Sequence, residues 1–178
     1  VRLSNFIADY CLESLNQDSI SILEPSVGDG HFVAAISENN RINKFQDISL
    51  TIVEREVDEL KKALKKCNKE FSLHSFNCDY LDFHKSNTNL FSLIIGNPPY
   101  IKSNLLSEKQ KTICKSIHND NGLNDKKINN IWTAFLVSSI QKLEDNGILA
   151  FVLPLELLQV KFSEEIRNLL QLSFQRLE

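Results

Sequence analysis

The chain has 178 residues, of which 42% are hydrophobic and 24% are charged, and its formal net charge at pH 7 is -3. This length is typical of one globular domain with a single core, and no apolar run reaches the roughly 20 residues of a membrane span. Nothing at the start resembles a signal peptide, so we expect a cytoplasmic protein. Affinity for phosphates comes from clustered Lys and Arg, and the net charge of -3 argues against a strong contribution from this chain. We therefore expect any nucleic-acid partner to be bound mainly outside this chain.

Cysteine and histidine spacing gives no sign of a metal centre. The four cysteines form no Cys-x-x-Cys pair and the four histidines have no ligand spacing, which predicts reduced thiols and no bound metal. The sequence begins at Val1 and contains no methionine, so we expect it to be a piece of a longer protein.

The first predicted elements are a helix, a strand and a glycine-containing turn. Apolar residues at helical spacing predict a helix over residues 3–15, capped by Ser4 or Asn5 and packed against a sheet. A strand over residues 19–23 then runs into residues 24–32, with the sequence Glu-Pro-Ser-Val-Gly-Asp-Gly-His-Phe, and a helix follows over residues 31–37.

The glycines of this turn are weak evidence for a ligand site by themselves. Gly28 and Gly30 would let the backbone bend tightly and approach a ligand closely, but an ordinary strand-to-helix turn needs the same residues. Glu24 argues against a phosphate here, because a carboxylate at the strand end repels anions and attracts a cationic amino-acid moiety.

The next two predicted strands also end in acidic residues. Residues 50–53 lead into Glu54, which is placed to accept hydrogen bonds from ribose hydroxyls. The five lysines between residues 61 and 69 lie opposite apolar helix positions, which favours a solvated helix face over a DNA-binding patch. Residues 71–78 lead into Asp79, which could accept a hydrogen bond from the amino group of an adenine while Tyr80 or Leu81 covers the ring. The alternative is that Asp79 only caps the following turn.

The fourth predicted strand is followed by residues 97–100, Asn-Pro-Pro-Tyr, which we call the Asn-Pro-Pro-Tyr motif. Proline cannot donate to a sheet ladder, so the strand over residues 93–96 must end there. The Asn97 side chain and the Pro98 carbonyl provide two neighbouring acceptors, and Tyr100 adds a flat ring, unless that ring is only a half-buried packing aromatic. Two acceptors and a ring suit a planar amine.

Four polar side chains therefore follow four predicted strands, namely Glu24, Glu54, Asp79 and Asn97. In a parallel α/β sheet, ligands collect outside the carboxyl ends of the strands, so we expect all four at one edge of the sheet.

The remaining sequence is less regular. Residues 101–130 form a long polar insertion with a modest helical pattern around 105–117, and we consider it a mobile lid. Residues 131–143 predict a helix that Asn146 and Gly147 stop, and residues 148–153 predict a buried strand that ends at Pro154. Residues 155–172 predict another helix, and residues 173–178 the start of one more strand.

The pattern resembles the class I S-adenosylmethionine-dependent methyltransferases, and among them the amino-methyltransferases of restriction–modification type that methylate adenine N6 in DNA. Residues 24–32 are similar to their cofactor motif, Asp-Pro-x-x-Gly-x-Gly-x-Phe, with Glu24 in place of Asp, and residues 97–100 match their catalytic motif. Residues 147–154 are similar to the following core strand, and the resemblance covers roughly residues 3–170.

The resemblance implies an α/β fold with a Rossmann-like, mostly parallel, doubly wound sheet and flanking helices. Residues 1–178 would be one catalytic domain with residues 101–130 inserted as a lid, and the last strands of the usual seven-stranded sheet and a target-recognition domain would lie outside the chain.

The resemblance also implies a cofactor, a partner and site residues. The cofactor is S-adenosylmethionine, leaving as S-adenosylhomocysteine, and the partner is double-stranded DNA with an adenine flipped out of the stack. The catalytic residues are Asn97, Pro98 and Tyr100: the first two accept the amino N–H groups, and the third stacks on the base. The residues implied for cofactor binding are Glu24, Pro25, Ser26, Gly28, Gly30, Phe32, Glu54, Asp79, Tyr80 and Asn97.

Several alternatives stay open at the level of sequence. The protein glutamine methyltransferases that act on release factors also carry Asn-Pro-Pro-Tyr, and an rRNA adenine methyltransferase is a further possibility. The polar insertion and the Glu24-Pro25 form of the cofactor motif favour DNA. A non-catalytic scaffold module would not need an intact Asn-Pro-Pro-Tyr motif, and a nucleotide-binding oxidoreductase would leave that motif unexplained.

Overall fold

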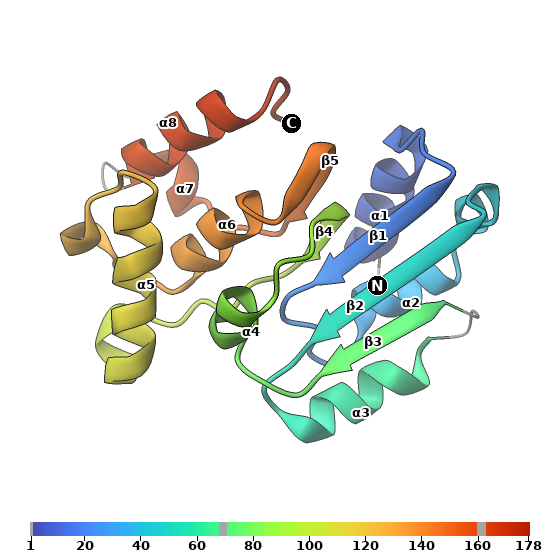
Figure 1. Ribbon diagram of the computed structural model, residues 1–178, viewed down its shortest axis with the longest axis horizontal. Helices are drawn as coiled ribbons and strands as arrows, with labels where there is room; N and C mark the ends of the chain where they lie inside the picture. The colour runs from blue at the N-terminus through green and yellow to red at the C-terminus, as the bar shows by residue number, and fades with distance from the viewer. Residues whose placement is uncertain (1, 68–70, 160–162) are drawn as a thin grey trace. The chain divides into compact units, whose positions relative to one another are not determined.

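The computed structural model describes residues 2–67, 71–159 and 163–178 (Figure 1). The chain divides into two compact units. One, the sheet unit, comprises Val1–Asn97 and Lys142–Phe151, and the other, the helical unit, comprises Pro98–Gln141 and Val152–Glu178.

The sheet unit is built on five parallel strands in the order β3-β2-β1-β4-β5. These strands are β1 (Ser19–Glu24), β2 (Asp47–Val53), β3 (Ser72–Phe76), β4 (Phe91–Gly96) and β5 (Leu143–Phe151). The strand order reverses direction next to β1, so the carboxyl ends of β1 and β4 form the crevice where ligands bind in open α/β sheets. The predicted Rossmann-like α/β fold is confirmed.

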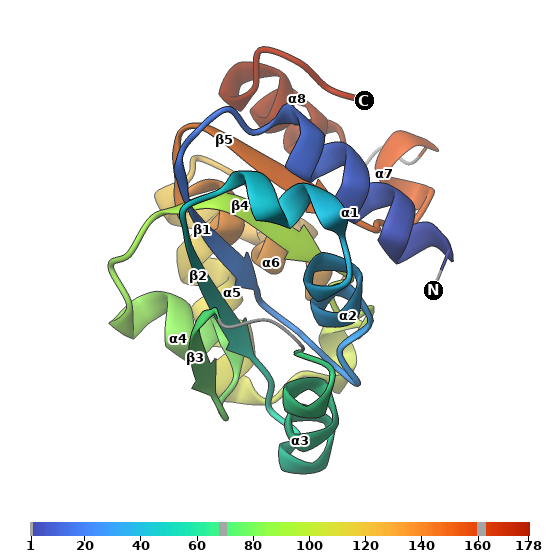
Figure 2. The ribbon, with the colours of Figure 1, turned by 90° about the vertical axis from the view of Figure 1, so that its right-hand side faces the viewer.

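Helices cover both faces of this sheet. They are α1 (Arg2–Ser14), α2 (His31–Ser37), α3 (Val57–Lys65) and α4 (Tyr80–Ser86), together with the short 3-10 helix η1 (Asn40–Lys44). The first three helices lie on one face and α4 on the other (Figure 2), as right-handed crossovers require when the strand order reverses.

The sheet core is made by the central strands. Ile22, Leu50, Ile52, Leu93 and Ile94 are fully buried. Strands covered on both faces often form continuous apolar runs, and β4 has such a run at Leu93, Ile94 and Ile95, whereas β1 and β2 alternate apolar residues with Ser and Thr. This continuous run makes β4 recognisable from its sequence.

The first helix differs from its prediction. It runs from Arg2, so Ser4 and Asn5 lie inside it and the predicted cap is wrong. Its buried side includes Ser4 and Ala8, whereas the larger Phe6 is exposed. Small residues allow the helix to approach its neighbours closely, and the spacing of large apolar residues alone therefore did not identify the packed face.

The last strand also begins earlier than predicted. Helix α6 (Trp132–Ile140) ends before residue 143, and Asn146 and Gly147 lie within β5 instead of ending a helix. Phe91 pairs with Leu143 but Leu93 pairs with Ile148, so β5 carries extra residues in a bulge, where Asn146 adopts a φ of 64°. Turn-forming residues are compatible with such a bulge.

The helical unit is built from helices, and the extended pairing among its described residues is the bridge of Lys102 with Asn130. Its elements are η2 (Ser103–Leu105), α5 (Glu108–Asp120), η3 (Asp125–Lys127), α6 (Trp132–Ile140), α7 (Glu156–Gln159) and α8 (Glu164–Ser173). Helix α5 begins with a capping box between Ser107 and Gln110.

Two predictions near the C-terminus need correction. The helix predicted over residues 155–172 is present as α7 and α8, with residues 160–162 outside the described part. The strand predicted over residues 173–178 is absent: Phe174 donates its amide to the Leu170 carbonyl at 3.0 Å, which continues the helical pattern, and residues 174–178 are irregular. None of the helices described is both long and apolar enough to cross a membrane.

Candidate active site

The glycine loop, residues 25–30, follows β1. Gly28 and Gly30 both have positive φ values, 52° and 84°. A Cβ at Gly30 would lie 2.6 Å from the Ala63 Cα in α3, whereas a Cβ at Gly28 would have no heavy atom within 4 Å. Gly30 is thus required for packing against α3, and Gly28 borders open space where a ligand could approach the backbone.

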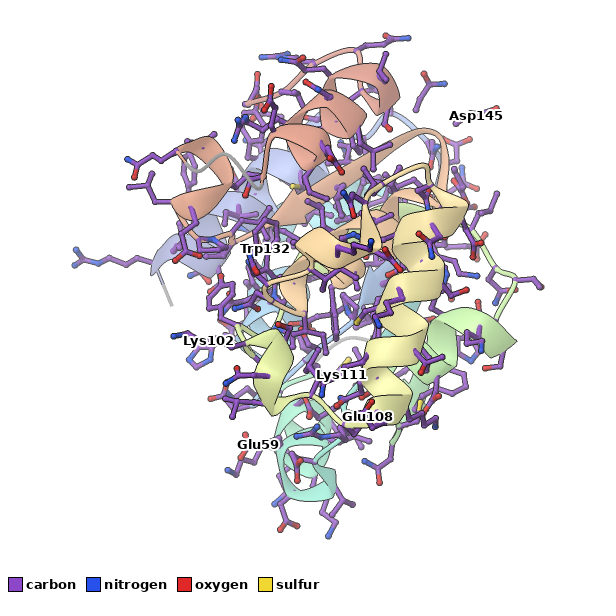
Figure 3. The ribbon with its side chains drawn as sticks, turned by 90° about the vertical axis from the view of Figure 1, so that its left-hand side faces the viewer. Glu59, Lys102, Glu108, Lys111, Trp132 and Asp145 are labelled. Carbon is purple, nitrogen blue, oxygen red and sulfur yellow. The ribbon has the colours of Figure 1, made fainter. Side chains whose placement is uncertain are left out.

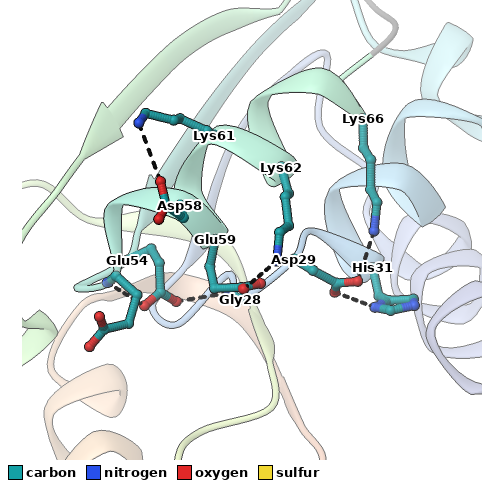
Figure 4. A network of polar contacts seen from close by, with 10 residues as sticks. Gly28, Asp29, His31, Glu54, Asp58, Glu59, Lys61, Lys62 and Lys66 are labelled. Carbon is teal, nitrogen blue, oxygen red and sulfur yellow. Dashed lines mark hydrogen bonds and ion pairs between the residues drawn. The ribbon is translucent and has the colours of Figure 1, made fainter.

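Glu54 fixes the shape of the glycine loop. Its Oε2 accepts the Gly28 amide at 2.8 Å and its Oε1 accepts the Glu56 amide at 2.9 Å (Figure 4). The Val27 amide also donates to the Val53 carbonyl at 3.1 Å. Each carboxylate oxygen can accept more than one hydrogen bond, so this role is compatible with the predicted bonds to ribose hydroxyls.

Glu24 is a buried carboxylate at the end of β1. It is only 1% exposed, and its Oε2 has no hydrogen-bond partner among the described residues. Burial raises the pKa of Glu24 well above its ordinary value, the carboxylates of Asp29 and Glu54 raise it further, and the Val33 amide opposes them. Burial favours the protonated carboxyl, but an ammonium group beside it would favour the carboxylate, so the unpartnered Oε2 fits the ammonium group of an amino-acid moiety.

Asp29 belongs to a charged cluster that the sequence did not predict. Its Oδ2 lies 3.0 Å from the Lys66 ammonium and its Oδ1 lies 2.5 Å from His31 Nδ1 (Figure 4). Although burial acts in the opposite direction, the hydrogen bonds from Lys66 and His31 lower the pKa of Asp29. This cluster ties the glycine loop to the ends of α2 and α3.

Asp79 caps a helix, and Tyr80 and Phe32, two aromatic residues predicted to bind the cofactor, are buried. Asp79 is the N-cap of α4, and its Oδ1 accepts the Leu81 amide at 2.9 Å. Tyr80 is only 2% exposed and stacks on Phe83, and Phe32 is also buried. The capping alternative for Asp79 is therefore present in the structure, and cofactor contacts by Asp79, Tyr80 and Phe32 stay predictions.

Asn77 is a further organising residue that sequence reasoning missed. Its Nδ2 donates to the carbonyls of Glu54 and Arg55, each at 2.9 Å. This side chain joins the loops that follow β2 and β3. An Asn directly after a strand is the signal that could have identified it.

Asn97 lies at the carboxyl end of β4, and its side chain is exposed. Ser26 Oγ donates to the Asn97 carbonyl at 3.1 Å. A Cβ at Gly96 would lie 3.5 Å from Pro25 Cδ, so the end of β4 packs closely against the glycine loop. Glu24 is the last residue of β1, Glu54 and Asn97 directly follow β2 and β4, and Asp79 lies three residues after β3. The predicted placement of these four residues at the carboxyl ends of parallel strands is confirmed.

The boundary between the two units falls between Asn97 and Pro98. Within the helical unit, Pro98 is buried, and Tyr100 is 45% exposed and donates its hydroxyl to the Val152 carbonyl at 2.6 Å. Burial raises the pKa of Tyr100, which keeps the hydroxyl protonated. The ring is thus anchored at its hydroxyl end.

Two curated relatives resemble most of this chain. Modification methylase CviBIII of Paramecium bursaria Chlorella virus NC1A is 28% identical over 156 residues, covering 87% of this chain and 36% of the relative. Type II methyltransferase M.BanIII of Aneurinibacillus aneurinilyticus is 24% identical over 197 residues, covering 99% of this chain and 33% of the relative. The chain therefore spans about a third of the length of these relatives.

One solved structure shares the fold of this chain, and one family model matches its sequence. A Listeria monocytogenes protein assigned to the class I S-adenosylmethionine-dependent methyltransferases superimposes with a TM-score of 0.73 at 12% identity, covering 96% of this chain and 49% of that one. This likeness shows the fold. The model of the Eco57I restriction-modification methylase matches residues 10–177. This match extends over nearly the whole sequence, and the chain belongs to the Eco57I restriction-modification methylase family.

Proposed function

We propose that this chain carries the catalytic and cofactor sites of a DNA methyltransferase that methylates N6 of an adenine flipped out of the duplex. The observation that carries the proposal is the Asn-Pro-Pro-Tyr motif directly after β4, in a member of a restriction-modification methylase family. Asn97 is exposed there, and Ser26 holds its main chain against the glycine loop.

The proposed cofactor is S-adenosylmethionine, which supplies an electrophilic methyl group on a sulfonium. Glu24 would hold its ammonium group, because the buried Oε2 is an acceptor without a partner among the described residues. Glu54 would accept from the ribose hydroxyls and Asp79 from the adenine amino group. Gly28 leaves space for close approach of the ligand to the backbone.

The two acceptors of the motif would orient the target amine. The exocyclic nitrogen of adenine is a poor nucleophile because its lone pair is delocalised into the ring. If Asn97 Oδ1 and the Pro98 carbonyl each accept one N–H, the nitrogen is biased toward tetrahedral geometry and its lone pair becomes available. An amide cannot act as a general base, so the proton leaves after the new N–C bond has formed.

Catalysis in this proposal comes mainly from positioning. Well-oriented groups contribute about 7–11 kcal/mol to lowering a barrier, and fixed acceptors add electrostatic stabilisation. Tyr100 would stack on the extruded base, which contributes about 1–3 kcal/mol per base. Its hydroxyl bond to Val152 supports a fixed ring orientation.

The test is transfer of a radiolabelled methyl group to duplex DNA by the intact natural protein that contains this sequence, followed by digestion to nucleosides. The proposal predicts label in N6-methyladenine. Label in a methylated cytosine would assign another base, and label in RNA or in a protein glutamine in preference to DNA would contradict the proposed substrate.

A further inference from the structure

Charge is distributed unevenly along the chain. The insertion, residues 101–130, contains six lysines and three acidic residues, a formal charge of +3. The rest of the chain contains 14 basic and 20 acidic residues, a formal charge of -6. Nucleic-acid binding depends on local clusters of cations and not on the overall charge. Although the overall charge is -3, a basic segment follows the Asn-Pro-Pro-Tyr motif directly in the sequence.

Three of these lysines line one cavity of about 540 Å³ in the helical unit, which we call the lysine cavity. Lys111 and Lys115 are four residues apart in α5 and so lie on one side of the helix, and Lys126 comes from η3. The floor includes the buried Leu106 and Cys114. A hollow with an apolar floor and a cationic rim favours an extended anion over a single metal ion.

The charges around the lysine cavity also favour the binding of an anion. Lys111 pairs with Glu108 at 2.8 Å at the start of α5 (Figure 3), but this carboxylate is 89% exposed, and such pairs are weak. In the described part of the chain, no carboxylate lies within ion-pair distance of the Lys115 or Lys126 ammonium groups. Asp125 is the carboxylate that lines the cavity, so its lining keeps a net positive charge.

Neutral polar groups complete the lining. Ser103 and Asn104 border the cavity and can donate hydrogen bonds from a hydroxyl and an amide. Lysine, serine and asparagine are residue types that contact phosphate oxygens in protein–DNA complexes. The chemistry of the cavity therefore suits a phosphodiester backbone.

The base of the insertion is fixed next to Tyr100. The Ile131 amide donates to the Ile101 carbonyl and the Ser103 amide donates to the Asn129 carbonyl, each at 2.9 Å, around the antiparallel bridge of Lys102 with Asn130. Ser103 follows Tyr100 by three residues, which spans at most about 11 Å of extended chain. Base pairs repeat about every 3.4 Å along the duplex, so Ser103 lies at most about three steps from Tyr100.

We propose that the lysine cavity binds the DNA phosphodiester backbone within a few base-pair steps of the flipped adenine. This inference rests on the proposed function and adds to it a backbone contact inside the catalytic chain itself. It assigns part of the DNA contact to residues 101–130, whereas the overall charge predicts that DNA is bound mainly outside this chain.

The test compares two double variants that each remove two positive charges. Lys115→Ala/Lys126→Ala removes two rim cations, and Lys65→Ala/Lys85→Ala removes two exposed lysines of α3 and α4. Affinity for a short fluorescent duplex is measured over a series of KCl concentrations with the intact natural protein. The plot of log affinity against log salt should become shallower by about 0.9 for each phosphate that the protein no longer neutralises, so by about 1–2 for the cavity variant.

The control variant should keep the wild-type slope, and Lys115→Arg/Lys126→Arg should restore it in the cavity. Far-UV circular dichroism checks that each variant is folded. An unchanged slope in Lys115→Ala/Lys126→Ala, or an equal change in the control, would overturn the inference. Failure of the proposed function is distinguishable, because wild-type protein would then place no label in DNA adenine whatever the salt slopes are.

Discussion

At the scale of single residues, the two glycines of the glycine loop have different roles: one is needed for packing and the other for ligand access. Gly30 meets the Ala63 backbone of α3, and Gly28 faces open space. Both adopt positive φ values, which cost a residue with a Cβ about 1–2 kcal/mol. Their substitution should therefore have different consequences.

We predict that Gly30→Ala destabilises the protein by about 2–4 kcal/mol, because overpacking against Ala63 adds to the backbone cost. Gly28→Ala should destabilise it by only about 1–2 kcal/mol but should weaken S-adenosylmethionine binding. Urea denaturation and titration calorimetry measure the two effects. Equal stability losses, or unchanged cofactor affinity in Gly28→Ala, would contradict these separate roles.

Glu24 should make the protein less stable as the pH rises. Its pKa is raised in the folded protein, whereas an unfolded Glu has a pKa of about 4.3. Between the two values the unfolded chain has released the proton that the folded chain retains, so stability falls with increasing pH. Asp29 and Glu54 face this carboxyl and strengthen the effect, and Lys66 and His31 offset part of the Asp29 charge.

We predict that Glu24→Gln removes this slope and raises stability at neutral pH, because Gln stays neutral in both the folded and the unfolded chain, while weakening S-adenosylmethionine binding. Denaturation at several pH values, with calorimetry on the same samples, measures both quantities. If the variant keeps the wild-type pH slope and the wild-type cofactor affinity, Glu24 is not the ammonium site.

Asp79 can be tested with a substitution that preserves its cap. Asp79→Ser keeps a side-chain oxygen for the Leu81 amide, so the stability should change by less than about 1 kcal/mol. We predict that cofactor affinity nevertheless falls, because a hydroxyl lacks the charge that strengthens a bond to the adenine amino group. Unchanged affinity would leave Asp79 with its capping role alone.

At the scale of elements, a buried histidine joins two helices of the helical unit. His118 of α5 lies within 3.0 Å of the Thr133 hydroxyl of α6, and both are buried. Burial lowers the pKa of His118 to about 4, against weaker opposing effects of Glu165 and Asp125. The imidazole is thus neutral where the helices pack, in agreement with a packing role.

The stability of the helical unit should fall as the pH decreases from about 6.5 to about 4, because the unfolded chain binds a proton that the folded chain excludes. At about 1.4 kcal/mol per pKa unit, the loss is at most about 3.5 kcal/mol. We predict that His118→Gln removes this part of the pH dependence. The difference between wild-type and variant denaturation curves isolates it, and identical slopes would show that His118 titrates normally.

Local signals explain which elements could be predicted. The helix α2 (His31–Ser37) matches its prediction because a glycine turn marks its start, and β4 ends at Gly96 because two prolines follow. The bulge in β5 could not be predicted, since Asn146 and Gly147 have the local signature of a turn and only the pairing with β4 places them inside a strand.

The same distinction holds for the site. The strand-end positions of Glu24, Glu54 and Asn97 follow from strand periodicity and parallel topology. The bonds that fix the site do not, because Ser26 and Asn97 are 71 residues apart and Gly28 and Glu54 are 26 residues apart. Hydrogen bonds between residues so far apart in sequence depend on the register of the strands.

At the scale of the whole molecule, the two units divide the proposed work. The sheet unit contains the glycine loop, Glu24 and Asn97, and carries an excess of acidic residues. The helical unit contains Tyr100 and the lysine cavity, which suit a base and its backbone. The acidic sheet unit and the locally basic helical unit match the charges of the proposed sulfonium cofactor and the proposed polyanionic substrate.

In the proposed function, Asn97 positions an adenine amine for methylation. This role is tested by measuring label transferred from radiolabelled S-adenosylmethionine to adenine in duplex DNA, with wild-type protein and with Asn97→Ala. We predict that the variant transfers at least about 100-fold less label, as when a preorganised polar group is removed from an active site, while its affinity for the cofactor stays nearly unchanged. Equal labelling of DNA by the variant would contradict this role.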